Sequence, residues 1–73
     1  MNKTELLKRF GKNVKIERIK RDLTQEQCAE ILGVSTHYFA CIENGKENMS
    51  LGKILYLSNT LEFKLEYLLN FSE

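Results

Sequence analysis

The sequence predicts an all-α protein, and three observations support this class. Apolar residues recur with helical spacing along the chain, and no stretch shows the sustained alternation of apolar and polar residues that is typical of a half-buried strand. Proline is absent and glycine occurs four times, which suits helices joined by short turns. A length of 73 residues fits one domain and is too short for two. We therefore expect a single compact domain over residues 1–73 with five helices.

The first helix is predicted to begin at Thr4, whose hydroxyl can cap it, and to end near residues 21–22. Its inner face consists of apolar residues at helical spacing, and this stripe continues toward Leu23. The residues of the inner face are Leu7, Phe10, Val14 and Ile19.

The second helix is predicted to begin after Thr24, which can form a capping box with Gln27 three residues later. Gly33 ends this helix, because glycine readily adopts the left-handed conformation found at helix C-termini. The predicted inner face consists of Cys28, Ile31 and Leu32.

The third helix follows after a tight turn, because Val34 is apolar and Ser35 can cap a new helix at once. A separation of about three residues is the spacing of a helix-turn-helix, which here covers residues 24–44. Asn44-Gly45 closes the third helix. Its inward side chains are Phe39 and Ile42.

A fourth helix is predicted after Ser50, which can cap it, and a fifth from residue 64 to residue 70. The fourth helix is expected to bury Leu51, Ile54, Leu55, Ser58 and Leu61. The fifth helix is expected to bury Leu65, Leu68 and Leu69.

The formal net charge is only +1, but the charge is distributed unevenly along the chain. Residues 1–21 hold eight basic and two acidic side chains, whereas residues 22–73 hold three basic and eight acidic ones. The first segment therefore carries +6 and the second −5. This polarity predicts a basic first helix that could flank a nucleic-acid backbone, although the basic excess of the whole chain is modest.

Several classes of protein are excluded by what the sequence lacks. No apolar run reaches the roughly 20 residues of a membrane span, and the first residues do not form a signal peptide, so a cytoplasmic protein without a membrane partner is expected. Cys28 and Cys41 are too far apart for a zinc site or a disulfide framework. Paired carboxylates, a Cys-His-Asp set and a phosphate-binding glycine loop are absent. We therefore expect neither an enzyme nor a bound metal, cofactor or small molecule.

The most specific part of the sequence is LTQEQCAEILGVS at residues 23–35, which is followed after six residues by IENGK at residues 42–46. This ordered set resembles the phage-repressor and Cro-type helix-turn-helix family, whose stand-alone members include restriction–modification controller proteins. The resemblance extends over residues 10–69. It implies a lambda-repressor-like fold and a DNA-binding transcriptional regulator, either repressor or activator, that binds a palindromic operator of double-stranded DNA as a homodimer.

The resemblance places the helix of residues 35–44 in the major groove as the recognition helix. Its outward stripe consists of Thr36, His37, Ala40, Cys41 and Asn44. Thr36 and His37 can hydrogen-bond base edges, whereas Ala40 and Cys41 can only touch thymine methyl groups. His37 and Cys41 are four residues apart, but two ligands make a poor zinc site. Because the stripe carries no Arg or Gln, specificity is expected to depend partly on DNA shape.

The resemblance also implies contacts to the sugar–phosphate backbone. Gln25, at the start of the second helix, is expected to bind a phosphate, with capping of its own helix as the alternative. Further backbone contacts are expected from Ser35, Tyr38, Asn44 and Lys46. For Tyr38 the alternative is a half-buried ring that packs on the second helix.

Arg18 and Glu43 stand where the family pairs an arginine of the first helix with a glutamate that ends the third. A partly buried pair of this kind fixes geometry more than it adds stability, because desolvation offsets much of the attraction. The alternative is two separate solvated charges.

The C-terminal helices, at about residues 50–71, are expected to form a two-fold dimer interface, as in the family. Aromatic residues form a second stripe beside the leucines of the fifth helix, and one small domain cannot easily bury both. The predicted dimer residues are Met49, Tyr56, Phe63, Tyr67 and Phe71. The alternative is that these rings cover the edge of the core.

The competing function is a protein-interaction module of the same fold, such as an antitoxin. A DNA-binding protein should lose affinity steeply as salt rises, which distinguishes the two functions.

Overall fold

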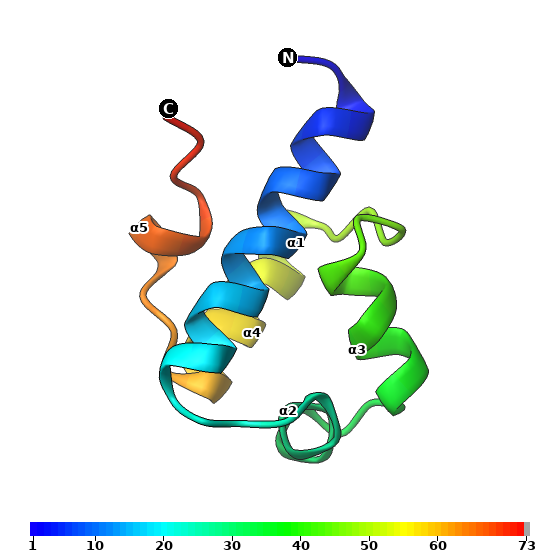
Figure 1. The fold of residues 1–73 in the computed structure, drawn as a ribbon, viewed down its shortest axis with the longest axis vertical. Helices are drawn as coiled ribbons and strands as arrows, with labels where there is room; N and C mark the ends of the chain where they lie inside the picture. The colour runs from blue at the N-terminus through cyan, green and yellow to red at the C-terminus, as the bar shows by residue number, and fades with distance from the viewer. Residues whose placement is uncertain (73) are drawn as a thin grey trace.

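The computed structural model describes residues 1–72 and contains, within this range, five helices and no strand (Figure 1). This architecture confirms the predicted all-α class. The helices are α1 (Lys3–Lys20), α2 (Gln25–Leu32), α3 (Thr36–Glu43), α4 (Leu51–Leu61) and α5 (Leu65–Leu68). Among the described residues, no helix has both the length and the apolar character that a membrane crossing requires.

The long helix α1 runs through the middle of the domain and packs against α3 on one side and α5 on the other (Figure 1). Helix α2 crosses the end of the domain and contacts both α3 and α4. The domain measures 31 by 21 by 20 Å. This arrangement leaves the outer side of α3 uncovered by any other described helix.

Four of the five helices begin at a side-chain cap, and three of these caps are those predicted from the sequence. Thr24 caps α2, Ser35 caps α3 and Ser50 caps α4. The prediction that Thr4 caps α1 is wrong, because the Oδ1 atom of Asn2 accepts a hydrogen bond from the Glu5 N–H at 2.9 Å. Asparagine is at least as good a cap as threonine, and the helix starts two residues earlier than a Thr4 cap would place it.

The core is formed by all five helices together with the segment between α4 and α5. The largest of its fully buried side chains are Val14, Cys28, Phe39, Ile42, Leu57, Phe63 and Leu68. Cys28 therefore behaves as a small core residue, as the sequence indicates, and its burial raises the pKa of its thiol.

Four apolar residues predicted for inner faces lie on the surface instead. These residues are Ile19, Ile31, Leu51 and Leu55. In the last turns of α1 the inner position belongs to Glu17, and in α4 the buried face is rotated so that Leu57 lies inside. Each helix buries only the side that meets its neighbours. Where apolar residues lie on two adjacent sides of a helix, the sequence does not show which side is buried.

Glu17 can occupy an inner position because basic side chains neutralise it. Its carboxylate accepts hydrogen bonds from Arg21 Nη1 at 3.0 Å and Lys20 Nζ at 3.1 Å. Burial acts to raise the pKa of this carboxyl, but the hydrogen bonds from the two cations outweigh burial and lower the pKa. Arg21 also donates to the carbonyl oxygen of Glu62, so this cluster joins α1 to the end of α4.

Helix α5 is shorter than predicted and ends at Leu68 rather than near residue 70. Side chains of α1 bind the carbonyl groups that follow it. Asn13 Nδ2 donates to the carbonyl oxygens of Leu68 and Asn70 at 3.0 and 2.9 Å, and Arg9 Nη1 donates to that of Phe71 at 2.9 Å. These contacts hold the chain after Leu68 in a non-helical path against α1.

The expectation that Phe63 belongs to an outward aromatic stripe is wrong. Its side chain is 1% exposed, and the Arg21 guanidinium lies over its ring at 4.6 Å from the centroid. Phe71 packs partly buried against the core. Tyr56 and Tyr67 are exposed, but Tyr56 contacts Leu32 of α2 whereas Tyr67 lies beneath Lys20 of α1. The five predicted residues therefore do not form one continuous surface.

Helix α1 lies so close to the end of α3 that only glycine fits at position 11. A Cβ on Gly11 would collide with the backbone carbonyl oxygens of Ile42 and Glu43. This contact is not predictable from the sequence, because a glycine inside a helical pattern does not indicate what it faces. The close approach fixes where α1 crosses α3.

We predict that Gly11→Ala destabilises the domain by about 1–3 kcal/mol, because one helix must move away from the other. The matched control is Gly52→Ala in α4, where no atom lies within 4 Å of the new Cβ. This control should gain about 0.5–1 kcal/mol from the higher helix propensity of alanine. Urea unfolding followed by circular dichroism measures both changes, and a Gly11→Ala variant as stable as the wild type would contradict the close contact.

Candidate nucleic-acid interface

The turn between α2 and α3 is fixed by hydrogen bonds at both of its ends. Gly33 adopts the left-handed conformation with φ 75°, and the N–H of Val34 donates to the carbonyl oxygen of Ala29 at 3.0 Å. Immediately afterwards, Ser35 Oγ accepts a hydrogen bond from the Tyr38 N–H at 3.0 Å. In the helix-turn-helix predicted from the sequence, the left-handed Gly33 thus ends α2 and the capping residue Ser35 begins α3.

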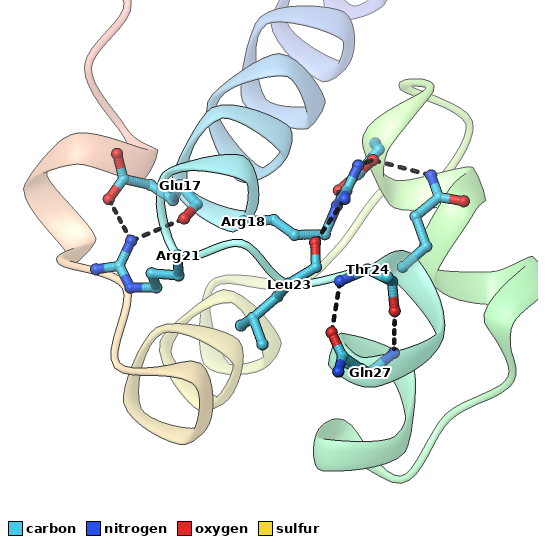
Figure 2. Close-up of polar contacts among 8 residues, drawn as sticks. Glu17, Arg18, Arg21, Leu23, Thr24 and Gln27 are labelled. Carbon is cyan, nitrogen blue, oxygen red and sulfur yellow. Dashed lines mark hydrogen bonds and ion pairs between the residues drawn. The ribbon is translucent and has the colours of Figure 1, made fainter.

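The start of α2 carries the predicted capping box, which Figure 2 shows at its labelled residues Thr24 and Gln27. Thr24 Oγ1 accepts from the Gln27 N–H at 3.0 Å, and Gln27 Oε1 accepts from the Thr24 N–H at 2.8 Å. The two bonds satisfy backbone donors that a helix start leaves free. They also set the direction in which α2 leaves α1.

Helix α3 divides into a buried side and an open side, as the helical spacing predicts. Phe39 and Ile42 lie in the core. The open side, here called the recognition face, consists of Thr36, His37, Ala40, Cys41 and Asn44. Thr36, His37 and Asn44 are exposed, whereas Ala40 and Cys41 are partly buried. A partner that approaches α3 from outside meets these five side chains first.

His37 and Cys41 contact each other on the recognition face, with 3.6 Å between Nε2 and Sγ. No third His, Cys, Asp or Glu joins them, and residues 1–72 contain no group of three or more such side chains that could hold a metal ion. The pair therefore remains part of a polar surface on α3.

Tyr38 lies to one side of the recognition face. Its ring is partly buried and lines an apolar groove between α3 and α4, together with Met49 and Tyr56. Leu32 of α2 contributes to the same groove. This position agrees with the half-buried alternative for Tyr38.

The turn after α3 places a lysine at the C-terminal end of the recognition face. Asn44 caps α3, and Gly45 follows in the left-handed conformation with φ 73°. The N–H of Lys46 donates to the carbonyl oxygen of Cys41 at 2.8 Å, which folds the chain back against the helix end. The side chains of Asn44 and Lys46 are both exposed there.

The carboxylate of Glu43 connects α1, α2 and α3 from inside. It accepts hydrogen bonds from Arg18 Nε at 2.6 Å and Arg18 Nη2 at 3.1 Å, while Arg18 Nη1 donates to the Leu23 carbonyl oxygen at 2.8 Å. The Glu43 side chain is 1% exposed. The hydrogen bond to Glu43 is the main cause that raises the pKa of Arg18. In Figure 2, Arg18 points toward α3 and Arg21 points away from it.

Gln25 is also bound to Glu43, which neither sequence-based alternative for this residue anticipated. Its Nε2 donates to Glu43 Oε1 at 2.9 Å. An amide nitrogen carries two hydrogens, so one N–H of Gln25 remains for another acceptor. The helix-start pattern of α2 gives no indication of this bond, because its partner lies 18 residues away in the sequence.

Comparisons with known proteins point to regulators. No family model matches the chain. The control protein C.MunI from Mycoplasma sp is 38% identical over 61 residues, and the alignment covers 82% of each chain. The crystal structure of the restriction-modification controller protein C.AhdI from Aeromonas hydrophila matches with a TM-score of 0.76 and 32% identity, over 85% of this chain and 94% of that one.

A third similarity concerns the fold alone. The structure of the hypothetical transcription factor NHTF from Neisseria matches with a TM-score of 0.80 at 21% identity, covering 96% of this chain and 80% of that chain.

The five-helix fold and the helix-turn-helix at α2 and α3 define a regulator of the Cro type. The similarity to C.MunI extends over most of both chains. The chain belongs to the restriction–modification controller proteins.

We predict that Glu43→Ala lowers the free energy of unfolding by about 3–5 kcal/mol, because Arg18 loses the partner of its buried charge. Glu43→Gln keeps the shape and some hydrogen bonds and should lose less. Glu30→Ala, at an exposed position on α2, is the control and should change stability by no more than about 0.5 kcal/mol.

Urea unfolding at neutral pH measures the three variants of this series. If Glu43→Ala matches Glu30→Ala in stability, the carboxylate does not hold the three helices together.

Proposed function

We propose that this controller protein binds double-stranded operator DNA as a homodimer and thereby regulates transcription, with residues 35–44 of each copy in the major groove. The observation that carries the proposal is the recognition face on α3, which is exposed and lies beside a capped α2. A major groove about 12 Å wide admits one α-helix, and a helix-turn-helix presents its second helix in this way. Membership of the controller-protein family supports the same function.

Within this function, base edges are read by the exposed part of the recognition face. The Thr36 hydroxyl can donate or accept, and the His37 ring can donate to a guanine N7 or O6. Ala40 and Cys41 are short and partly buried, so they offer at most apolar contact to a thymine methyl group. Few direct contacts imply that sequence-dependent DNA shape contributes to specificity.

Contacts to the sugar–phosphate backbone come from the ends of the two helices. The free N–H of Gln25 lies at the N-terminus of α2, where backbone N–H groups and the helix dipole also favour a phosphate. Ser35 is exposed at the start of α3, and Asn44 and Lys46 are exposed at its end. Tyr38, which is half-buried at the groove between α3 and α4, adds a contact to the backbone from that side.

The homodimer uses the open face of α4 rather than the aromatic stripe expected from the sequence. Leu51 and Leu55 lie one helical turn apart and are 77% and 48% exposed. Tyr56, which is also exposed, lies next to them on the same helix. Exposed apolar side chains in successive turns favour burial against another surface, and a two-fold axis would bury the same patch on both copies.

The DNA-binding function predicts that an inverted repeat is enriched when the wild-type protein selects from a random-sequence DNA pool at near-physiological salt. Its half-sites should lie about one helical turn apart, because two recognition helices related by a two-fold axis enter successive major grooves. Thr36→Ala and His37→Ala should change the preferred bases, whereas Lys46→Ala should weaken binding to all sequences alike.

Failure to enrich any inverted repeat would contradict operator binding by a dimer. Binding that is insensitive to salt would instead favour the protein-interaction module.

The dimer proposal predicts that Leu51→Glu combined with Leu55→Glu converts a dimer into a monomer, because charges placed in an apolar interface lose hydration without a partner. Ile16→Glu combined with Ile19→Glu is the matched control, since both isoleucines are exposed on α1. Sedimentation equilibrium of wild type and variants measures the change. The proposal fails if the α4 variant remains dimeric or if the α1 variant is equally disrupted.

A further inference from the structure

Apart from Lys3 at the first turn of α1, the basic side chains of residues 1–21 fall into two groups, and the sequence does not show which residue belongs to which. One group is engaged within the domain. Arg18 binds Glu43, Lys20 and Arg21 bind Glu17, and Arg9 binds the carbonyl oxygen of Phe71. These cations stabilise contacts between helices and are committed to partners of the same chain.

The other group contains three exposed lysines on one side of α1, here called the lysine ridge. The ridge consists of Lys8, Lys12 and Lys15. Within residues 1–72, none of the three forms an ion pair with an acidic side chain. Their charges are therefore available to a ligand.

The contacts of α1 place the lysine ridge beside the C-terminal end of α3. Gly11 touches the last carbonyl groups of α3, and Lys8 and Lys15 lie three residues before and four residues after it on the same side of the helix. The backbone of Lys8 also lies against Gly45, since a Cβ on that glycine would be 2.9 Å from the Lys8 Cα. Lys46, the next residue in the chain, is exposed at the same end of α3.

The recognition face itself carries no lysine or arginine, and the nearest such residue in the sequence is Lys46. A helix lying in a major groove has a sugar–phosphate strand on each side of it. Cations that flank such a helix face phosphate, and neutralised phosphates release counterions and thus provide much of the binding free energy. The acidic residues of the chain cannot serve this purpose.

We infer that the lysine ridge of α1 is a second DNA-binding surface, which contacts the phosphates of the strand that flanks α3. The inference rests on the proposed DNA-binding function and adds residues to it. Its ligand is the phosphate backbone, so the ridge contributes affinity for every DNA sequence and leaves base preference to Thr36 and His37.

The test compares two variants that remove the same charge from different faces. The ridge variant carries Lys8→Gln and Lys15→Gln. The control variant carries Lys20→Gln and Lys64→Gln, whose ammonium groups both lie over the Tyr67 ring, 5.5 Å from its centroid. Binding to the selected operator and to a random duplex is measured by fluorescence anisotropy over a series of salt concentrations, and urea unfolding verifies that both variants are folded.

For the ridge variant, the slope of log K against log salt concentration should become less negative by about 0.9 for each lost phosphate contact, or about 1.8 for two. Affinity for the random duplex should fall by the same factor as affinity for the operator, and the preferred sequence should not change. The control variant should keep the wild-type slope.

Equal slopes for wild type and ridge variant, with wild-type binding intact, overturn the lysine ridge and leave the proposed function standing. If the ridge and control variants lose the same amount of DNA affinity, the lysine ridge is also overturned, because the effect then depends on total charge and not on the position of the lysines. If the wild type itself binds no DNA, the proposed function fails and the ridge fails with it.

Discussion

The relation of α1, α2 and α3 depends on one buried carboxylate, because Glu43 accepts three hydrogen bonds from side chains of the other two helices. A carboxylate removed from water is unfavourable unless its charge and its lone pairs are both satisfied. Arg18 supplies the opposite charge, and Gln25 supplies a further donor. Such a group tolerates little displacement, since a shift of any of the three helices leaves a buried charge without its partner. The orientation of the recognition face is set by this polar contact as much as by apolar packing.

The basic side chains of α1 and the turn after it differ in whether they are paired within the domain or exposed. Basic side chains that reach inward are paired, and the ion pairs of Arg18 and of Arg21 lie on opposite sides of the last turns of α1 (Figure 2). The exposed lysines of the ridge, Lys8, Lys12 and Lys15, lie beside the end of α3. A net charge of +1 is therefore a poor guide to the electrostatic surface, because part of the basic charge of residues 1–21 is paired within the domain and the rest of it is exposed on α1.

The sequence predicted best those features that depend on neighbouring residues. Each of these features involves residues no more than four positions apart. The structure contains all four that were predicted, namely the caps at Thr24, Ser35 and Ser50 and the left-handed Gly33. The division of α3 into two sides was also predicted. The DNA-contacting residues remain a proposal, since their partner is not part of the chain.

Features that depend on distant parts of the chain were predicted less well. Leu51 and Leu55 have the spacing of a buried face, but α4 packs against α2 and α5 with a side that carries Leu57 instead. Phe63 is buried because Ser58 Oγ donates to its carbonyl oxygen at 2.6 Å, which turns the chain inward. The bond from Gln25 to Glu43 likewise joins residues far apart in the sequence. The Arg18–Glu43 pair was anticipated only through the family resemblance.

The short, capped helices of the helix-turn-helix have a further consequence for recognition. An isolated peptide of eight residues would scarcely form a helix in water, because nucleation is unfavourable and few hydrogen bonds follow it. In the domain, α3 is held in its helical state by the Ser35 cap, the core contacts of Phe39 and Ile42 and the bonds of Glu43. The conformational entropy of ordering α3 is thus lost during folding and not during association. A partner that fits this surface meets it already formed, and little of the interaction free energy is needed to organise it.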